Sequence, residues 1–206
     1  MKKIVSFVLF LALLVCVTAC GGKKPPQGGG TNNPPAAQTV YEKLGELAAK
    51  NYSRVSVSVV SGVEGVTLTA NYVLTQSSVQ YSIEQLNQLP ADGSASGISP
   101  SYKTTVSGSA AVNGGEIVLD GESVNLPSYS ELKGSFDFSA SGFANVVESG
   151  NTFSADIASV ATFFGAAVDI QNAKISVNYT ETALSKIVIT YQKANASVTT
   201  TYTFEA

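Results

Sequence analysis

The stretch RVSVSVVSGVEGVTLTANY, residues 54–72, alternates apolar and polar side chains on both sides of a short turn. Val55, Val57 and Val59 alternate with polar residues before the turn, and Leu68 and Ala70 continue the alternation after it. A period of two residues is typical of strands that bury one face, and strands joined by a tight turn run antiparallel. The stretch therefore predicts two antiparallel strands of a sheet with one buried face.

The same period of two recurs through most of the chain. It is found at residues 79–83, 102–112, 117–119, 136–138, 175–179, 187–191 and 198–204. The sequence NGG at residues 113–115 predicts a tight turn between two of these strands, and residues 89–101 predict a longer loop. We expect about nine or ten strands in all.

The sequence TVYEKLGELAAKNY, which begins at Thr39, has the period of a helix instead. Thr39 and Glu42 match a capping box, in which two side chains three residues apart accept hydrogen bonds from each other's backbone N–H groups. Leu44, Leu47 and Ala48 fall on one face at helical spacing. The segment predicts an N-terminal helix of about three turns that is apolar on one side.

Residues 141–165 interrupt the strand pattern late in the chain. They contain a strand-like run around Phe153, but Val160, Phe163 and Phe164 are spaced like residues on one face of a helix. We interpret this part of the segment as a short helical insertion.

An estimate of area predicts the shape of the sheet. Nine strands at about 4.8 Å spacing and about 20 Å in length form a face of about 900 Å². A helix of three turns covers only about 200 Å². Because the helices cannot cover a flat face of this size, the sheet must curl around them or split into two facing layers. We expect an α+β fold of mostly antiparallel β structure, a curved half-barrel sheet with an N-terminal helix and a short helical insertion.

The start of the chain is typical of an exported protein. Lys2 and Lys3 precede an apolar run at residues 4–17, which is shorter than the roughly 20 residues that a membrane-spanning helix needs. We interpret residues 1–19 as a signal peptide that is removed. Residues 20–38 are rich in Gly, Pro and Asn, which predicts a disordered tether, and residues 39–206 then form a single domain.

Residues 17–21, VTACG, resemble the lipobox of bacterial lipoproteins, in which cleavage falls directly before a cysteine that carries lipid. The resemblance implies that Cys20 is acylated and that the protein is anchored in the cell envelope. Its place is then the outer side of the cytoplasmic membrane or the outer membrane. An ordinary signal peptide with a chance cysteine is the alternative interpretation.

The composition argues against catalysis and against nucleic-acid binding. The chain has no histidine, and Cys16 leaves with the signal, so neither a Ser-His-Asp nor a Cys-His arrangement is available. We expect no enzymatic activity, no cofactor and no metal, although Asp137, Asp156 and Asp169 lie beside apolar residues as weaker candidates for paired carboxylates. Removal of the signal leaves 10 of the 12 basic residues against 15 acidic ones, a surface that repels phosphates.

The order of elements resembles that of the lipoprotein-carrier (LolA/LolB-like) fold, a half-closed barrel whose helices plug an apolar cavity. The resemblance covers residues 39–206 and implies a cavity that takes acyl chains. Tyr and Thr residues on the expected inner face make that face more polar than an acyl-binding wall needs to be.

Five phenylalanines within 30 residues are the candidate ligand contacts, and we hypothesise that they line the mouth or floor of the half-barrel: Phe136, Phe138, Phe143, Phe163 and Phe164. The alternative is that they form plain core. Two functions follow from these alternatives. The first is a monomeric module that binds a lipid or another amphiphile, and the second is a surface interaction or structural lipoprotein whose packed domain meets a protein partner in the envelope.

Overall fold

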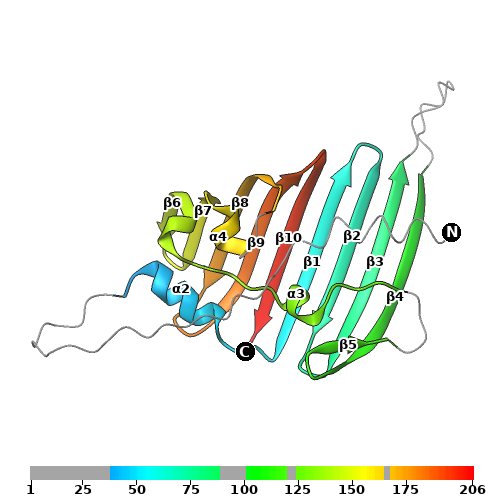
Figure 1. The fold of residues 1–206 in the computed structure, drawn as a ribbon, viewed down its shortest axis with the longest axis horizontal. Helices are drawn as coiled ribbons and strands as arrows, with labels where there is room; N and C mark the ends of the chain where they lie inside the picture. Colours follow the sequence, from blue (N-terminus) through cyan, green and yellow to red (C-terminus); the bar gives the residue numbers. More distant parts are fainter. Residues whose placement is uncertain (1–37, 89–100, 120–123, 165–167) are drawn as a thin grey trace, which may run out of the picture.

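A computed structural model describes residues 38–88, 101–119, 124–164 and 168–206. Ten antiparallel strands form one open sheet in the order β5-β4-β3-β2-β1-β10-β9-β8-β7-β6 (Figure 1). The strands are β1 (Arg54–Val63), β2 (Val66–Leu74), β3 (Ser78–Gln88), β4 (Ser101–Asn113), β5 (Glu116–Val118), β6 (Phe143–Ser149), β7 (Thr152–Ile157), β8 (Gln171–Tyr179), β9 (Leu184–Lys193) and β10 (Ala196–Glu205). The predicted antiparallel sheet is confirmed.

The first and last strands of the chain, β1 and β10, are neighbours at the centre of the sheet. Val57 of β1 lies opposite Tyr72 of β2 on one side and opposite Tyr202 of β10 on the other. The buried positions of β1 alternate with exposed ones as the sequence pattern predicts. This register joins the β1–β5 meander to the β6–β10 meander in one continuous sheet.

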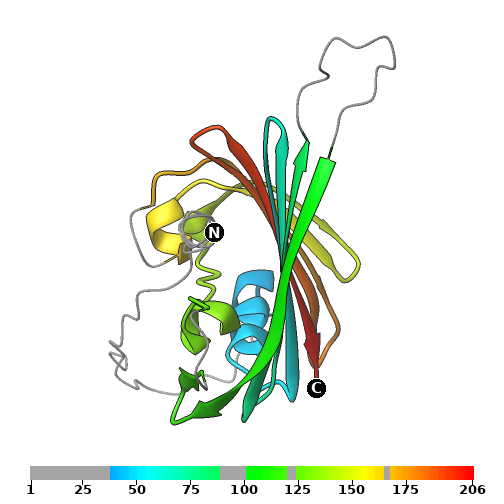
Figure 2. The same cartoon turned by 90° about the vertical axis from the view of Figure 1, so that its right-hand side faces the viewer.

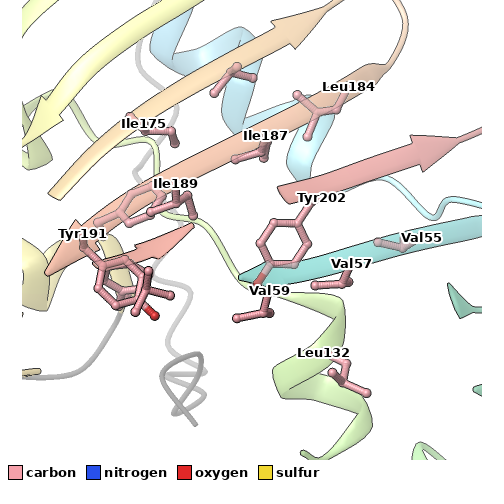
Figure 3. Packing of buried hydrophobic residues seen from close by; sticks show 14 of the residues in the cluster. Val55, Val57, Val59, Leu132, Ile175, Leu184, Ile187, Ile189, Tyr191 and Tyr202 are labelled. Atoms are coloured by element: carbon pink, nitrogen blue, oxygen red, sulfur yellow. The ribbon is translucent and has the colours of Figure 1, made fainter. Parts of the chain in front are cut away.

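The helices all lie on one side of the sheet, which curves around them (Figure 2). They are α2 (Val40–Ala48), α3 (Tyr129–Lys133), α4 (Val160–Phe164) and the short 3₁₀ helix η1 (Ala140–Gly142). The main contacts join α2 to β9, α3 to β1 and β2, and α4 to η1. We call the side of the sheet that faces these helices the concave face. Figure 3 shows residues of β1, β9 and β10 on this face together with Leu132 of α3.

Both predicted helices are confirmed. Thr39 caps α2, and the capping box with Glu42 is complete in both directions. Leu44 and Leu47 are buried on the face that the spacing predicts. Among the described residues, no helix is both long enough and apolar enough to cross a membrane.

The prediction of a strand at Phe136 and Phe138 is wrong. Gly134, at φ 76°, ends α3, and residues 134–139 then run across the concave face without regular secondary structure. The backbone N–H of Asp137 bonds the carbonyl of Phe163, outside the sheet. The alternation of the two phenylalanines reflects an extended segment that lies over the sheet. The sequence analysis also did not predict α3 or β6.

Candidate functional site

A small enclosed space lies between α3 and the concave face of the sheet. Its volume is about 20 Å³, which is close to the room that one water molecule needs. It is lined by residues of β1, β2, β9 and β10 below and by α3 and the residue before its cap above: Val57, Val59, Tyr72, Tyr191, Thr200, Tyr202, Pro127, Glu131 and Leu132. We call this the α3 site.

Strand pairing brings the lining residues together from distant parts of the chain. Val57 is paired with Tyr72 on one side and with Tyr202 on the other, and Val59 is likewise paired with Thr200. Because successive residues of a strand point to opposite faces, all of these side chains lie on the concave face.

The α3 site combines apolar walls with buried hydroxyl groups. Tyr72 and Tyr191 are almost fully buried, and Thr200 is one of two buried polar side chains among the described residues. Burial raises the pKa of Tyr72 to about 12. Burial also raises the pKa of Tyr191 to about 12, although a hydrogen bond with Thr200 acts in the opposite direction. Both phenols are therefore neutral at physiological pH and can each donate one hydrogen bond.

Few interactions hold α3 over this space. Leu132 is the buried residue of the helix and packs in the core. The Tyr129 hydroxyl donates a hydrogen bond of 2.8 Å to the backbone carbonyl of Thr75. Ser128 and Glu131 form a capping box that stabilises the helix itself. Pro127, directly before the cap, is also buried, and Leu126 and Tyr129 are partly buried against the core. Among the described residues, α3 is therefore held over this space by apolar packing of a few side chains and by one side-chain hydrogen bond.

The structure brings the five candidate phenylalanines together. Phe138, Phe143, Phe163 and Phe164 are buried, whereas Phe136 is partly buried. Ring centroids lie 5.6 Å apart for Phe143 and Phe163 and 4.9 Å apart for Phe163 and Phe164. These are the separations of packed aromatic pairs. The five rings thus form a packed cluster at one end of the concave face, and their role as ligand contacts stays a prediction.

Phe136 connects this cluster to the α3 site and to the surface. Its ring lies edge-on to that of Tyr202, with centroids 5.0 Å apart. Phe136 and Phe138 also line an open groove of about 590 Å³ between α2 and residues 135–140. This groove is open to solvent and is bordered by Tyr41 and Glu42 of α2.

The other candidates from the sequence have structural roles or lie elsewhere. Asp137 accepts two hydrogen bonds from Ser139, and Asp156 pairs with Asn145 and Lys174. Cys20, the signal peptide and the tether as far as residue 37 lie outside the described residues. Within the described ranges, no three His, Cys, Asp or Glu side chains are grouped closely enough to hold a metal ion.

The sequence analysis missed the α3 site, although a signal for it exists. Thr200 falls in phase with the apolar residues Val198 and Tyr202 of β10, where a buried side chain is expected. A polar residue at such a position needs a polar partner. The partner, Tyr191, is identified only by the pairing of β9 with β10.

The chain matches no model of a known protein family, and no curated protein is similar to it in sequence at a significant level.

Proposed function

We propose that this protein is a membrane-anchored bacterial lipoprotein without enzymatic activity, and that its concave face binds a lipid or another amphiphile. The observation that carries the proposal is an apolar concave face that spans the open sheet, with buried hydroxyl groups at its centre. Ligand pockets of small amphiphiles combine an apolar wall with a few polar groups in the same way.

The apolar residues of the concave face extend beyond the helices. Val79, Tyr81 and Ile83 of β3 are buried on the inner face, although β3 has no main contact with a described helix. Partly buried apolar residues outside the helices, among them Ile117, Val124 and Leu126, pack against this core. A ligand on this part of the face would have to displace such side chains.

In this proposal the entrance lies under α3. The space beneath this helix is about 20 Å³, whereas pockets for small ligands measure roughly 300 to 1,000 Å³. Binding therefore requires α3 to move away from the sheet. Its movement would break the hydrogen bond from Tyr129 and expose Pro127 and Leu132. It would leave Tyr72, Tyr191 and Thr200 in place to bind the polar end of the ligand.

The start of the chain and the order of its elements support the proposed location. Acylation at Cys20 would hold the domain at the membrane, and a tether of about 18 residues, disordered as the sequence predicts, would span on the order of 25 Å. The domain then works close to the lipid surface. The half-barrel with an N-terminal helix and a late helical insertion resembles the lipoprotein-carrier fold, whose cavity accepts acyl chains.

Photolabelling tests the proposed site residue by residue. A fatty acid with a photoactivatable diazirine in its chain is added to membranes that contain the full-length protein, and labelled peptides are mapped by mass spectrometry. We expect label on Val57, Val59 and Thr200, and we expect excess unlabelled fatty acid to compete it away.

Residues on the opposite face of the same strands serve as the control. Ser58 and Thr201 alternate with these residues and point to the opposite face of the sheet. Equal labelling of the two faces, or label that unlabelled fatty acid does not reduce, would contradict binding on the concave face.

The packed phenylalanine cluster favours a second candidate function. Because the rings contact one another directly, the domain has a well-filled core at that end of the sheet. A packed domain of this kind serves as a surface interaction or structural lipoprotein with a protein partner. Absence of specific photolabel would favour this function over amphiphile binding.

A further inference from the structure

The two edges of the sheet differ in how they are protected. At one edge, β6 has a bulge between Ala144 and Val147, and Asn145 takes a left-handed conformation at φ 50°. Bulges and charges at an edge prevent further strands from pairing with it. At the other edge, β5 pairs only with Ala111, Val112 and Asn113 of β4.

Residues 101–110 of β4 form a long free edge. Among the described residues they pair only with β3, and nearly all of them are exposed. The segment SYKTTVSGSA contains no proline, and its one charged side chain, Lys103, is neutralised by Glu84 at 2.6 Å. It has neither the proline nor the bulge that blocks pairing at natural edges.

The β4–β5 turn shows which backbone groups point outward. Gly114 and Gly115 both have positive φ, at 62° and 86°, which is the type I′ turn of a two-residue hairpin. Asn113 and Glu116 close this hairpin, so the N–H and C=O groups of Asn113 point away from β3. The N–H and C=O groups of successive residues in a strand point alternately to one side of the strand and to the other. The odd-numbered residues from Ser101 to Ser109 therefore also direct their N–H and C=O groups to the free edge.

We propose that this edge pairs with the same edge of a second copy of the chain. An antiparallel two-fold pairing centred on Thr105 sets Lys103 opposite Ser107 of the second copy, and Ser101 opposite Ser109. Every outward N–H and C=O group of the odd-numbered residues then has a partner. No like charges face each other, since Lys103 is the one charged residue in the segment.

The same register matches side chains on the concave face. Tyr102, whose side chain is half exposed, lies opposite Gly108 of the second copy. Gly108 has no room for a side chain of its own, because a Cβ would lie 2.5 Å from the Tyr81 hydroxyl. The ring of Tyr81 thus occupies the place over Gly108, and the register sets Tyr102 of one copy beside Tyr81 of the other. Cross-strand aromatic neighbours stabilise a sheet, and a second copy supplies this tyrosine at a fixed position, which an arbitrary extended peptide does not.

The edge contact is small beside the roughly 1,200 to 2,000 Å² of stable complexes. The two copies therefore associate weakly in dilute solution. With the lipid anchor of the proposed function, on which this step rests, the local concentration at the membrane surface is higher and the same contact is populated more fully. The sequence-based expectation of a monomer is the alternative that the following test decides.

Disulfide cross-linking tests the pairing and its register. Residues that exchange both hydrogen bonds have Cα atoms about 5.5 Å apart, within the span of a disulfide. We expect full-length Thr105→Cys, oxidised mildly in bacterial membranes, to form a dimer at least tenfold more abundant than in the parent protein. The parent protein serves as the control for disulfides that form through its own cysteines, Cys16 and Cys20.

Ser101→Cys is the matched control on the same strand. In the proposed register the two copies of residue 101 are about 27 Å apart, so this variant should not exceed the parent. Equal cross-linking of Thr105→Cys and Ser101→Cys, no cross-linking of Thr105→Cys, or its linkage to other proteins instead of a second copy would overturn the proposal.

Discussion

The Tyr129 hydroxyl of α3 donates a hydrogen bond of 2.8 Å to the backbone carbonyl of Thr75, at the turn between β2 and β3. This bond and the burial of Leu132 fix the helix over the hydroxyl groups of the α3 site. The cover of the proposed binding site is thus held by contacts that single substitutions can remove.

Replacement of Tyr129 by phenylalanine should loosen the cover. The loss of one hydrogen bond reduces the free energy of unfolding by about 1 kcal/mol, and we expect photolabelling at Val59 and Thr200 to become faster. Tyr52→Phe is the control, because Tyr52 bonds Leu47 and Leu184 at the end of α2, away from the α3 site. Equal labelling rates in the two variants would show that α3 does not control entry.

The buried phenols predict a loss of stability at alkaline pH. Burial raises the pKa of Tyr72 and of Tyr191 from 10.0 in the unfolded chain to about 12 in the folded one. Below pH 10 both states keep the proton, so the stabilisation is fully present. Between pH 10 and 12 only the unfolded state loses it, and the free energy of unfolding falls.

Urea unfolding at several pH values measures this effect. Above about pH 10, we expect the free energy of unfolding to fall less steeply in Tyr72→Phe than in the parent. The variant lacks one of the two tyrosines whose pKa is raised in the folded state. The comparison with the parent cancels the contributions of all groups that the two proteins share. Parallel declines in the two proteins would contradict the burial of an intact phenol at this position.

Truncation distinguishes packed phenylalanines from ligand contacts. Phe163 and Phe164 are buried in the ring cluster, so Phe163→Ala and Phe164→Ala should each lower the free energy of unfolding by roughly 3 to 5 kcal/mol. Phe136→Ala should lower it less, because this ring is partly exposed and borders the open groove. Small losses at Phe163 and Phe164 together with weaker binding of a fluorescent fatty acid would instead make them walls of an open cavity.

The anchor is tested at Cys20. We expect Cys20→Ala to abolish the incorporation of radiolabelled palmitate and to leave the protein either with an uncleaved signal or released from the membrane. Membrane fractionation followed by autoradiography measures both effects. Equal palmitate label in the variant and the parent would contradict acylation at this residue.

Alternation along the chain predicts the strands well wherever the pairing is regular. Val55, Val57 and Val59 show the period of two because each faces the core from a strand with two regular neighbours. The period fails in β6, where the bulge after Ala144 shifts the register. At residues 136–138 the period of two correctly indicates an extended backbone. A run of only three residues, however, does not distinguish a strand from an extended segment that crosses the sheet.

The candidate site depends on contacts that local patterns do not contain. Tyr72 is far in sequence from Tyr191 and Thr200, and the three residues meet only through the pairing of β1 with β2 and β10, and of β9 with β10. The sequence SYSE that forms the capping box of α3, from Ser128 to Glu131, is a local signal that identifies this helix. The five phenylalanines, in contrast, are close together in the chain, so the sequence alone marks them as a group.

Native mass spectrometry of the protein purified from its bacterial membranes tests amphiphile binding most directly. We expect, beyond the mass of the acylated chain, a further mass of one lipid or fatty acid that is lost on collisional activation without breaking a covalent bond. Tyr129→Phe should show this species with at least the occupancy of the parent, because binding requires α3 to move away from the sheet and the variant makes this movement easier. A spectrum that contains only the acylated chain, both in the parent and after incubation with added fatty acid, would contradict the account.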